Sequence, residues 1–317
     1  ALRREYNISN LCLAGGVALN CVANGKILRD DGFENIWIQP AAGDAGGSIG
    51  AALALWFNEF NSKRSVNTDD AMKGAFLGPS YTDVEAKKEL IDLDANFKQV
   101  SQPEMINTTA RLLDEGNAIG WFQGRMEFGP RALGARSILG DPRSEKTQKN
   151  LNLKVKYRES FRPFAPSVLA EKVSEWFEQK SESPYMLFVA NVRESVRCEV
   201  NKNDEVLFGI DRLNVKRSII PAVTHVDYSS RIQTVHRDTN PVYYDLISEF
   251  DRVTGCPIVV NTSFNVRGEP IVCSPTDAFK CFMGTELDVL VIGNLILFKT
   301  DQDIDLLENY RDKYELD

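Results

Sequence analysis

The sequence predicts an α/β protein with two domains. An apolar strand at residues 8–13 leads into Gly15-Gly16 and a helix, and a second strand at residues 35–39 leads into the Gly-rich turn at 43–50 and another helix. Repeated strand, turn and helix units are typical of sheets covered by helices. The 317 residues, 43% hydrophobic and 26% charged, are enough for two cores.

A polar segment at residues 61–68 and the turn at Gly78-Pro79-Ser80 predict a domain boundary near residues 62–80. We therefore expect one domain at 1–75 and a second at 76–317. In the second domain, Thr82 and Glu85 form a capping box that begins a helix. Further strands are expected at 118–122, 257–260, 287–292 and 295–298, and a hairpin is expected from strands at 219–226 and 231–235. The acidic tail after Asp301 is expected to be peripheral.

Composition excludes several classes of function. The net charge of -8 and the pI near 5.1 argue against general binding to nucleic acid or to membrane surfaces. No apolar run reaches the roughly 18 to 20 residues that span a bilayer. The six cysteines include no C-x-x-C pair, and we interpret them as reduced thiols of a cytoplasmic protein.

The segment at residues 126–143 predicts an anion site, because three arginines lie there among three glycines and two prolines. Glycine and proline shape turns that bring backbone N–H groups close to a ligand, and guanidinium groups bind phosphate or carboxylate oxygens in pairs. The alternative is a turn followed by a solvated arginine face.

A second cationic segment covers residues 154–166. If this segment is a strand, Lys154, Lys156 and Arg158 share one face. Cations on one face repel each other unless an anion lies among them, so we favour a phosphate groove over an edge strand with protective lysines.

Three polar turns follow predicted strands. Gly15-Gly16 is typical of nucleotide-binding turns but also of close helix packing. Asp44 lies where ligands of α/β sheets bind, and either coordinates a metal or ribose or forms an Asx-turn. The loop at residues 261–270 gathers hydroxyls and amides that bind triphosphates or carbamoyl-type amides, or simply form turns. The two histidines, His225 and His236, flank the predicted hairpin without metal-binding spacing.

Residues 13–20, 128–139 and 261–270 together closely resemble the NodU/CmcH-type O-carbamoyltransferases, and the resemblance runs over nearly the whole chain. It implies that residues 1–75 are the C-terminal part of an ASKHA-like (ribonuclease H-like) domain. It also implies that residues 76–317 form a YrdC-like α/β domain with a twisted mixed sheet.

The resemblance implies an ATP-dependent O-carbamoyltransferase, or its C-terminal fragment. The second domain would form carbamoyl-adenylate from carbamoyl phosphate and ATP, with Mg²⁺, and the first would pass the carbamoyl group to a hydroxyl of a small-molecule acceptor. The implied catalytic residues are Arg131, Lys156, Arg162 and Arg231. The implied substrate- and nucleotide-binding residues are Gly15, Gly16, Asn20, Arg136, Arg158, Asn261, Thr262, Ser263 and Asn265. Asp44 matches a ligand of the family's Fe²⁺.

The chain departs from the family pattern at two places. The histidine pair that the family supplies to its iron is absent, so we expect a fragment or split product in which Asp44 alone does not hold iron. Tyr228 stands where we expect glycine, which predicts strain in the turn before Arg231. Two alternatives stay open: a nucleotide-binding fragment that needs a separate N-terminal half or a homodimer, and a threonylcarbamoyl-AMP synthase-like enzyme of tRNA modification.

Overall fold

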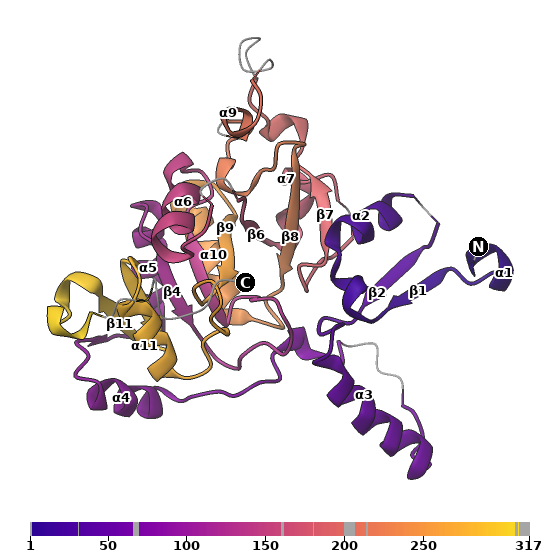
Figure 1. The fold of residues 1–317 in the computed structure, drawn as a ribbon, viewed down its shortest axis with the longest axis horizontal. Coiled ribbons are helices and arrows are strands. Elements are labelled where there is room, and N and C mark those ends of the chain that lie inside the picture. The colour runs from indigo at the N-terminus through magenta and orange to yellow at the C-terminus, as the bar shows by residue number, and fades with distance from the viewer. Residues whose placement is uncertain are drawn as a thin grey trace.

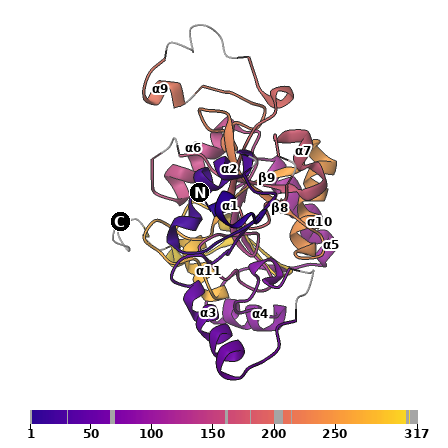
Figure 2. The ribbon, with the colours of Figure 1, turned by 90° about the vertical axis from the view of Figure 1, so that its right-hand side faces the viewer.

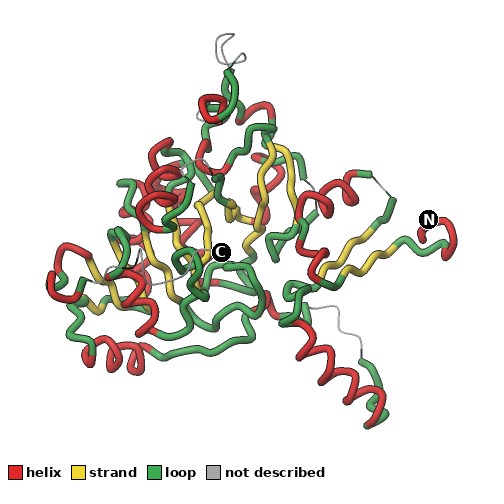
Figure 3. Tube along the Cα trace, in the orientation of Figure 1, coloured by secondary structure: helices red, strands yellow, loops and turns green. Residues whose placement is uncertain are grey.

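The computed structural model describes residues 2–30, 32–65, 70–159, 162–179, 181–199, 207–213, 215–307 and 310. Within these ranges the strands form a two-stranded sheet near the N-terminus and a nine-stranded sheet that holds most of the core (Figures 1 and 3). The predicted α/β class is confirmed, and the large sheet is mixed. The boundary near residue 75 stays a prediction.

The N-terminal lobe, as we call residues 2–65, is built around the parallel pair of β1 (Asn10–Leu13) and β2 (Asn35–Ile38). Its helices are α1 (Leu2–Tyr6), η1 (Gly16–Leu19), α2 (Cys21–Arg29), α3 (Gly46–Ala54) and the π-helix η2 (Leu55–Glu59). Asn20 begins α2, because its side chain accepts a hydrogen bond from the backbone N–H of Ala23 at 3.1 Å. The predicted strand, turn and helix order is confirmed here.

The large sheet has the order β3-β11-β10-β4-β5-β9-β6-β8-β7. Its strands are β3 (Lys98–Gln99), β4 (Ile119–Phe122), β5 (Arg136–Gly140), β6 (Ala165–Leu169), β7 (Phe188–Asn191), β8 (Ser229–Val235), β9 (Ile258–Ser263), β10 (Val289–Ile292) and β11 (Leu295–Phe298). The pairs β10–β4 and β6–β8 are parallel, and the other pairs are antiparallel. The central strands are apolar and buried because helices cover the sheet.

The longer helices pack in two pairs. Helix α5 (Gln102–Asp114) packs against α10 (Pro241–Thr254), which also contacts β6 and β9 (Figure 2). Helix α4 (Asp83–Asp92) packs against α11 (Pro275–Met283), which contacts β4 and β10. The capping box of Thr82 and Glu85 begins α4 as the sequence predicts.

Short helices complete the described part of the fold. They are η3 (Lys73–Ala75), α6 (Glu145–Asn150), the π-helix η4 (Leu151–Val155), η5 (Ala170–Lys172), α7 (Val173–Trp176), η6 (Glu194–Val196), α9 (Ile210–Leu213), η7 (Pro221–Val223), η8 (Lys299–Asp301) and η9 (Ile304–Leu306). No helix in the described ranges is long and apolar enough to cross a membrane.

The N-terminal lobe joins the large sheet at its end strand, β7, along which α2 packs. From α2, Asn24 Nδ2 donates to the carbonyl oxygen of Leu187 at 3.1 Å, and a guanidinium nitrogen of Arg29 donates to that of Val189 at 2.8 Å. Gly25 lets the helix approach, since a Cβ there would lie 2.5 Å from the carbonyl oxygen of Val189. Side chains of α2 thus satisfy carbonyl groups at the end of the sheet.

Helix α3 projects away from both sheets (Figure 1). None of its residues is buried, although its sequence is largely apolar. Leu53, Leu55, Trp56 and Phe60 are each about half exposed or more. The lobe therefore presents an apolar face that the described chain does not cover.

Two predicted elements are wrong. The predicted strand at 219–226 contains the short helix η7 instead, and β8 pairs with β6 and β7, so there is no hairpin of these two segments. The cationic segment is not a strand in its described part, because Leu151–Val155 continues α6 as a π-helix and Lys156 ends it. Residues 160–161 of that segment, and residues 66–68 of the predicted polar linker, lie outside the described residues.

The tail after Asp301 is peripheral only in part. Tyr310 is buried and its ring packs on Gly284, where a Cβ would clash with it. Residues 311–317 lie outside the described residues.

Candidate functional site

A cavity of about 500 Å³ lies where α2 of the N-terminal lobe meets the large sheet. Its walls come from six segments that are far apart in the sequence. They are Cys21 and Val22; Pro130, Arg131 and Ala132; Arg158 and Arg162 to Ala165; Met186 and Val189; His225, Asp227, Ser229 and Arg231; and Asn261 to Ser263. Four arginines and one aspartate make this cavity strongly cationic, and we call it the arginine cavity.

Arg131 comes from a loop that crosses over to the N-terminal lobe. Gly129 precedes it with a φ of 135°, a conformation that favours glycine, and a Cβ there would lie 3.0 Å from the carbonyl oxygen of Pro40. The Arg131 guanidinium makes one long hydrogen bond, 3.4 Å, to the carbonyl oxygen of Leu19, and its Nε is buried without a partner. Burial lowers the pKa of Arg131. Its donors are therefore largely unused by the protein, as expected of a group that binds a ligand anion.

Glu127 shapes this loop from inside. Its Oε1 accepts hydrogen bonds from the backbone N–H groups of Leu133 at 2.6 Å, Ala135 at 2.8 Å and Arg136 at 3.3 Å. Burial raises the pKa of Glu127, against the effect of these hydrogen bonds. Gly134, with a φ of 102°, lies so close to the ring of Tyr243 that no side chain fits. The loop is therefore held rigidly from its buried side.

Arg231 lies on β8, opposite Val189 of β7. Burial and the nearby Arg131 charge lower the pKa of Arg231 to about 10, and the Cys21 side chain opposes this shift. The turn before β8 does contain a residue with positive φ, Tyr228 at 62°, so the strained turn predicted from its bulky side chain is confirmed. The turn nevertheless places Arg231 in the cavity.

Arg158 and Arg162 extend the cationic wall toward a neighbouring cavity of about 300 Å³, which both residues also line. Arg158 Nε donates to Asn152 Oδ1 at 2.7 Å and the guanidinium lies over the Phe164 ring, 4.9 Å from its centroid. Burial lowers the pKa of Arg158 to about 10, with a further contribution from Arg162. Arg162 itself is largely exposed.

Lys156 lines the neighbouring cavity together with Ser263, Asn265 and the turn at 266–270. Its Nζ donates to the backbone oxygens of Ser263 and Asn265 and to their side chains, including Asn265 Oδ1 at 2.7 Å. Burial lowers the pKa of Lys156 to about 7, and the charge of Arg158 contributes. Lys156 thus connects the cationic segment to the loop after β9.

Asn261 is the buried polar residue of β9 at the wall of the arginine cavity. Its Nδ2 has acceptors in the backbone oxygen of Ala132 at 3.1 Å, Ser167 Oγ at 3.0 Å and Gln233 Oε1 at 2.9 Å. Gln233 in turn donates to the backbone oxygen of Leu133 at 2.9 Å. This network attaches the Arg131 loop to the sheet, and Thr262 and Ser263 follow along the same wall.

Comparison with known families identifies the chain. The family model described as "Carbamoyltransferase C-terminus" matches residues 110–299, more than half of the chain, and the model "Carbamoyltransferase N-terminus" matches residues 1–53. The chain belongs to the carbamoyltransferase family. The matched C-terminal region carries all four arginines of the cavity, and the matched N-terminal region carries Cys21 and Val22.

Several curated relatives of this carbamoyltransferase chain are similar along most of it. An uncharacterized protein of Synechocystis is 56% identical over 99% of this chain and 51% of its own length. The nodulation protein NolNO of Sinorhizobium fredii is 43% identical over 92% of this chain and 40% of its own length. The 3'-hydroxymethylcephem-O-carbamoyltransferase of Amycolatopsis lactamdurans is 30% identical over 90% of this chain and 48% of its own length. The NodU/CmcH resemblance is confirmed, and the chain spans about half the length of the curated relatives it matches.

One solved structure, full-length HypF in its phosphate- and nucleotide-bound form, is similar over 64% of this chain and 22% of its own. The TM-score is 0.37 and the sequence identity 16%. This likeness is too low to carry an argument about the site.

The structure brings most of the predicted site residues of this carbamoyltransferase chain together. Those that line one or both cavities are Arg131, Lys156, Arg158, Arg162, Arg231, Asn261, Thr262, Ser263 and Asn265. Gly15, Gly16 and Asn20 line neither cavity; their neighbours Cys21 and Val22 do.

Two arginines of the 126–143 segment are used inside the protein instead. The Arg136 side chain is fully buried, donates to carbonyl oxygens of Gln123 and Ala135 at 3.0 Å, and lies over the Phe122 ring, 3.5 Å from its centroid. Burial lowers the pKa of Arg136 to about 10. Arg143 forms ion pairs with Asp114 at 2.6 Å and Asp141 at 2.7 Å. Neither lines the arginine cavity, so we leave both out of the proposed site.

Asp44 lies in the exposed turn between β2 and α3. Across the described ranges, no group of three or more His, Cys, Asp and Glu side chains is arranged to hold a metal ion. The residues present around Asp44 therefore do not fit an iron site, and no chemical step is assigned to iron.

Sequence reasoning missed several residues of the cavity wall, among them Cys21, His225 and Asp227. It also missed Glu127, which holds the Arg131 loop from inside. His225 and Asp227 line the arginine cavity. Burial lowers the pKa of His225; the Asp227 carboxylate raises it, and the Arg231 charge lowers it further. The signal was the H-x-D spacing just before Arg231. Glu127 was detectable as the single carboxylate at the start of an arginine- and glycine-rich segment.

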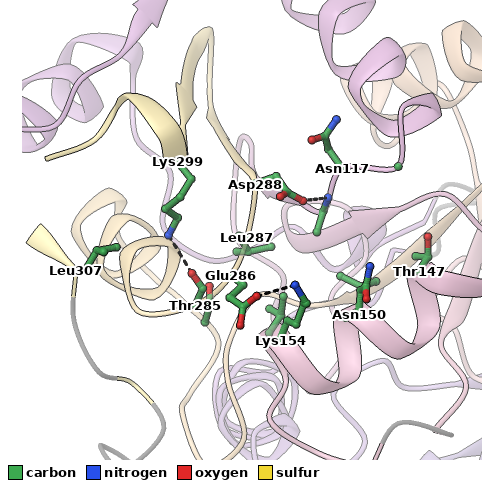
Figure 4. A pocket seen from close by; sticks show the side chains of 14 residues that line it. Asn117, Thr147, Asn150, Lys154, Thr285, Glu286, Leu287, Asp288, Lys299 and Leu307 are labelled. Carbon is green, nitrogen blue, oxygen red and sulfur yellow. Dashed lines mark hydrogen bonds and ion pairs between the residues drawn. The ribbon is translucent and has the colours of Figure 1, made fainter. Parts of the chain in front are cut away.

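A separate cavity of about 310 Å³ shares no lining residue with these two (Figure 4). Its charges are used within the protein: Lys154 pairs with Glu286 at 2.8 Å, Lys299 donates to the Thr285 carbonyl oxygen at 3.0 Å, and Asp288 accepts from the Ala118 N–H at 2.7 Å. The arginine cavity, with largely unused donors, is the better candidate for an anionic substrate.

Proposed function

We propose that this chain carries the adenylation site of an ATP-dependent O-carbamoyltransferase. In this proposal the arginine cavity binds carbamoyl phosphate and ATP, forms carbamoyl-adenylate, and the carbamoyl group then passes to a hydroxyl of an acceptor. The observation that carries the proposal is the convergence of Arg131, Arg158, Arg162 and Arg231 on one cavity. The family membership and the O-carbamoyltransferase among the relatives support it.

The charge of the cavity suits two polyanionic substrates. Carbamoyl phosphate and ATP repel each other, so their encounter needs fixed positive charge on both sides of the reacting atoms. Guanidinium groups supply this charge with paired donors that match phosphate oxygens. ATP is expected to arrive with Mg²⁺, and the neighbouring cavity beside Lys156 gives room for the longer of the two substrates.

The proposed reaction balances with one water molecule. Water cleaves the acyl phosphate to carbamate and inorganic phosphate, and a carbamate oxygen attacks the α-phosphorus of ATP and expels pyrophosphate. In the transfer step, the acceptor hydroxyl attacks the carbamoyl carbon, loses its proton and releases AMP. The arginines bind the substrates, hold the phosphates in position and stabilise the charge that develops on the leaving groups.

Product analysis tests this proposal. The chain is incubated with ATP, Mg²⁺ and carbamoyl phosphate, and pyrophosphate, phosphate and carbamoyl-adenylate are measured by enzymatic assay and mass spectrometry. Pyrophosphate release that needs both substrates, and that is lost in Arg131→Ala but not in Arg237→Ala, supports the proposal. Arg237 is the matched control because it is exposed and pairs with Asp245 at 2.5 Å. Equal turnover in all three proteins would overturn it.

A second candidate is a nucleotide-binding fragment that acts only with a separate N-terminal half or in a homodimer. The uncovered apolar face of α3 and η2 favours this candidate. It predicts that ATP raises the melting temperature of the chain while no product forms. It also predicts that the N-terminal half of a relative, added as a separate protein, restores transfer of the carbamoyl group. A threonylcarbamoyl-AMP synthase-like activity would instead need bicarbonate and threonine, and the mass of the product separates it from carbamoyl-adenylate.

A further inference from the structure

The first step of the proposed reaction needs a base, because the attacking water must lose a proton. Most titratable side chains among the described residues of the arginine cavity are arginines, which keep their protons near neutral pH. The others are Cys21, His225 and Asp227. Of these, only an imidazole has an ordinary pKa close to neutral pH, where a general base is most effective. His225 is therefore the candidate for this role.

The backbone fixes His225 at the start of the turn that leads into β8. Its N–H donates to the carbonyl oxygen of Ser229 at 2.9 Å, and its carbonyl oxygen accepts from the N–H of Tyr228 at 3.0 Å. The same turn leads to Arg231 on β8. Both His225 and Arg231 line the cavity, and the Arg231 charge acts on the imidazole. The ring is therefore held near a guanidinium of the proposed phosphate site.

The ring nitrogens of His225 are not used by the described part of the chain. Within the described ranges the ring forms no hydrogen bond, and neither nitrogen is sealed from solvent. A neutral imidazole accepts a proton at one nitrogen and donates from the other. His225 therefore has a nitrogen available to a water molecule in the cavity.

The charges around the ring suit a base that acts once the substrates are bound. Because burial and the Arg231 charge lower the pKa of His225, against the effect of Asp227, the imidazole is neutral before the substrates bind. Burial alone would raise the pKa of Asp227, but hydrogen bonds from Ser229 Oγ at 2.6 Å and Ser229 N–H at 3.0 Å outweigh this and keep the carboxylate charged. That charge and the phosphates of two bound substrates favour the imidazolium that forms when the water loses its proton.

We propose that His225 is the general base of the water-dependent step, in which carbamoyl phosphate is cleaved to carbamate and phosphate. The water oxygen forms a bond to phosphorus, and the bond between phosphorus and the bridging oxygen breaks, so that carbamate leaves with the electron pair. The proton of the water passes to the available nitrogen of the imidazole and then to solvent. This inference rests on the proposed function and adds the group that takes the proton, which the arginines do not supply.

The kinetics of phosphate release test this role in the full chain with carbamoyl phosphate, ATP and Mg²⁺. We expect kcat in His225→Gln and His225→Ala to fall roughly 100- to 10,000-fold, with little change in the KM for carbamoyl phosphate. The matched control is His236→Ala, the same substitution at the other histidine, which lines neither cavity and lies 3.9 Å from Glu182. A kcat in His225→Gln equal to that in His236→Ala overturns the proposal.

Added imidazoles distinguish a base from a residue that only supports the fold. The ring of His225 forms no hydrogen bond to the described chain, so His225→Ala should change the melting temperature little. In this variant, free imidazole should raise the rate of phosphate release about tenfold or more, and substituted imidazoles should do so in the order of their basicity. Rescue that does not follow basicity, or no rescue by any imidazole, overturns the proposal.

The outcomes distinguish this inference from the proposed function. If pyrophosphate release needs both substrates and His225→Ala turns over at the unmodified rate, the role of His225 as base fails and the adenylation site stands. If the unmodified chain releases neither phosphate nor pyrophosphate, the proposed function fails together with the inference.

Discussion

The Glu127 carboxylate accepts a hydrogen bond from the backbone N–H of Leu133 at 2.6 Å. The same oxygen accepts from Ala135 and Arg136. The loop that carries Arg131 therefore closes around a carboxylate of its own chain, and the largely unbonded Arg131 guanidinium is left for a ligand.

Replacing Glu127 should destabilise this loop. In Glu127→Ala, three backbone N–H groups lose their shared acceptor, so we expect a loss of about 3 kcal/mol in the free energy of unfolding, measured by urea denaturation. Glu127→Gln keeps an oxygen acceptor and should lose less. The exposed Glu286 is the control, and a loss in Glu127→Ala no larger than in Glu286→Ala would contradict this view of the loop.

Substitution of Arg131 should change ligand affinity, whereas substitution of Arg136 should change stability. Arg131→Ala should weaken the binding of phosphonoacetamide, a stable analogue of carbamoyl phosphate in which a carbon replaces the bridging oxygen, roughly tenfold or more. The melting temperature should change little, because the Arg131 guanidinium makes only a long bond to the protein. Arg136→Ala should lower the melting temperature strongly, because it removes a buried side chain bonded to several carbonyl oxygens. Calorimetric titration and thermal unfolding of both variants check this. An Arg131→Ala protein that binds normally but melts much earlier, or an Arg136→Ala protein that melts normally but binds weakly, would contradict the assignment.

Lys156 should make stability depend on pH. Burial lowers its pKa to about 7 from an ordinary value of 10.5. Between these values the unfolded chain binds the proton and the folded chain does not, so the contribution of Lys156 to stability rises as the pH rises from about 7 to 10.5. Lys156→Met should lack this contribution. Melting curves at several pH values test the difference, and identical pH profiles for the two proteins would show that the burial of Lys156 does not act in this way.

Gly25 should control how the N-terminal lobe meets the sheet. In Gly25→Ala, the Cβ would lie 2.5 Å from the carbonyl oxygen of Val189, so α2 must shift away from β7. Because Cys21 and Val22 of α2 line the arginine cavity, we expect weaker binding of phosphonoacetamide, measured by titration.

The matched control is Gly50→Ala, in the exposed helix α3, where a Cβ meets nothing within 4 Å. Alanine favours helix over glycine, so this variant should bind normally and gain about 0.5–1 kcal/mol in stability. Equal affinities for Gly25→Ala and Gly50→Ala would mean that α2 does not position the cavity wall.

Local chemistry made several features predictable. Asn20 begins α2 and Thr82 begins α4 because their side chains accept from backbone N–H groups a few residues away. Tyr228 has the positive φ expected of its turn. Errors arose where local preference was overridden: the alternating cations at 154–158 suggested a strand, but this segment continues α6 and its end is held by Lys156, whose partners lie more than 100 residues away.

The sequence by itself determined the strand, turn and helix order of the N-terminal lobe, the capping box that begins α4, the family and the cationic segments, because these depend on neighbouring residues and on motifs. Only the tertiary structure decided which cations meet a ligand. Arg131 and Arg136 lie five positions apart in the same motif, yet one lines a cavity with unused donors and the other is buried against Phe122 and backbone carbonyls. That difference follows from how distant segments pack around each guanidinium, since burial and hydrogen-bond partners, and not residue type, determine whether its charge is free for a substrate.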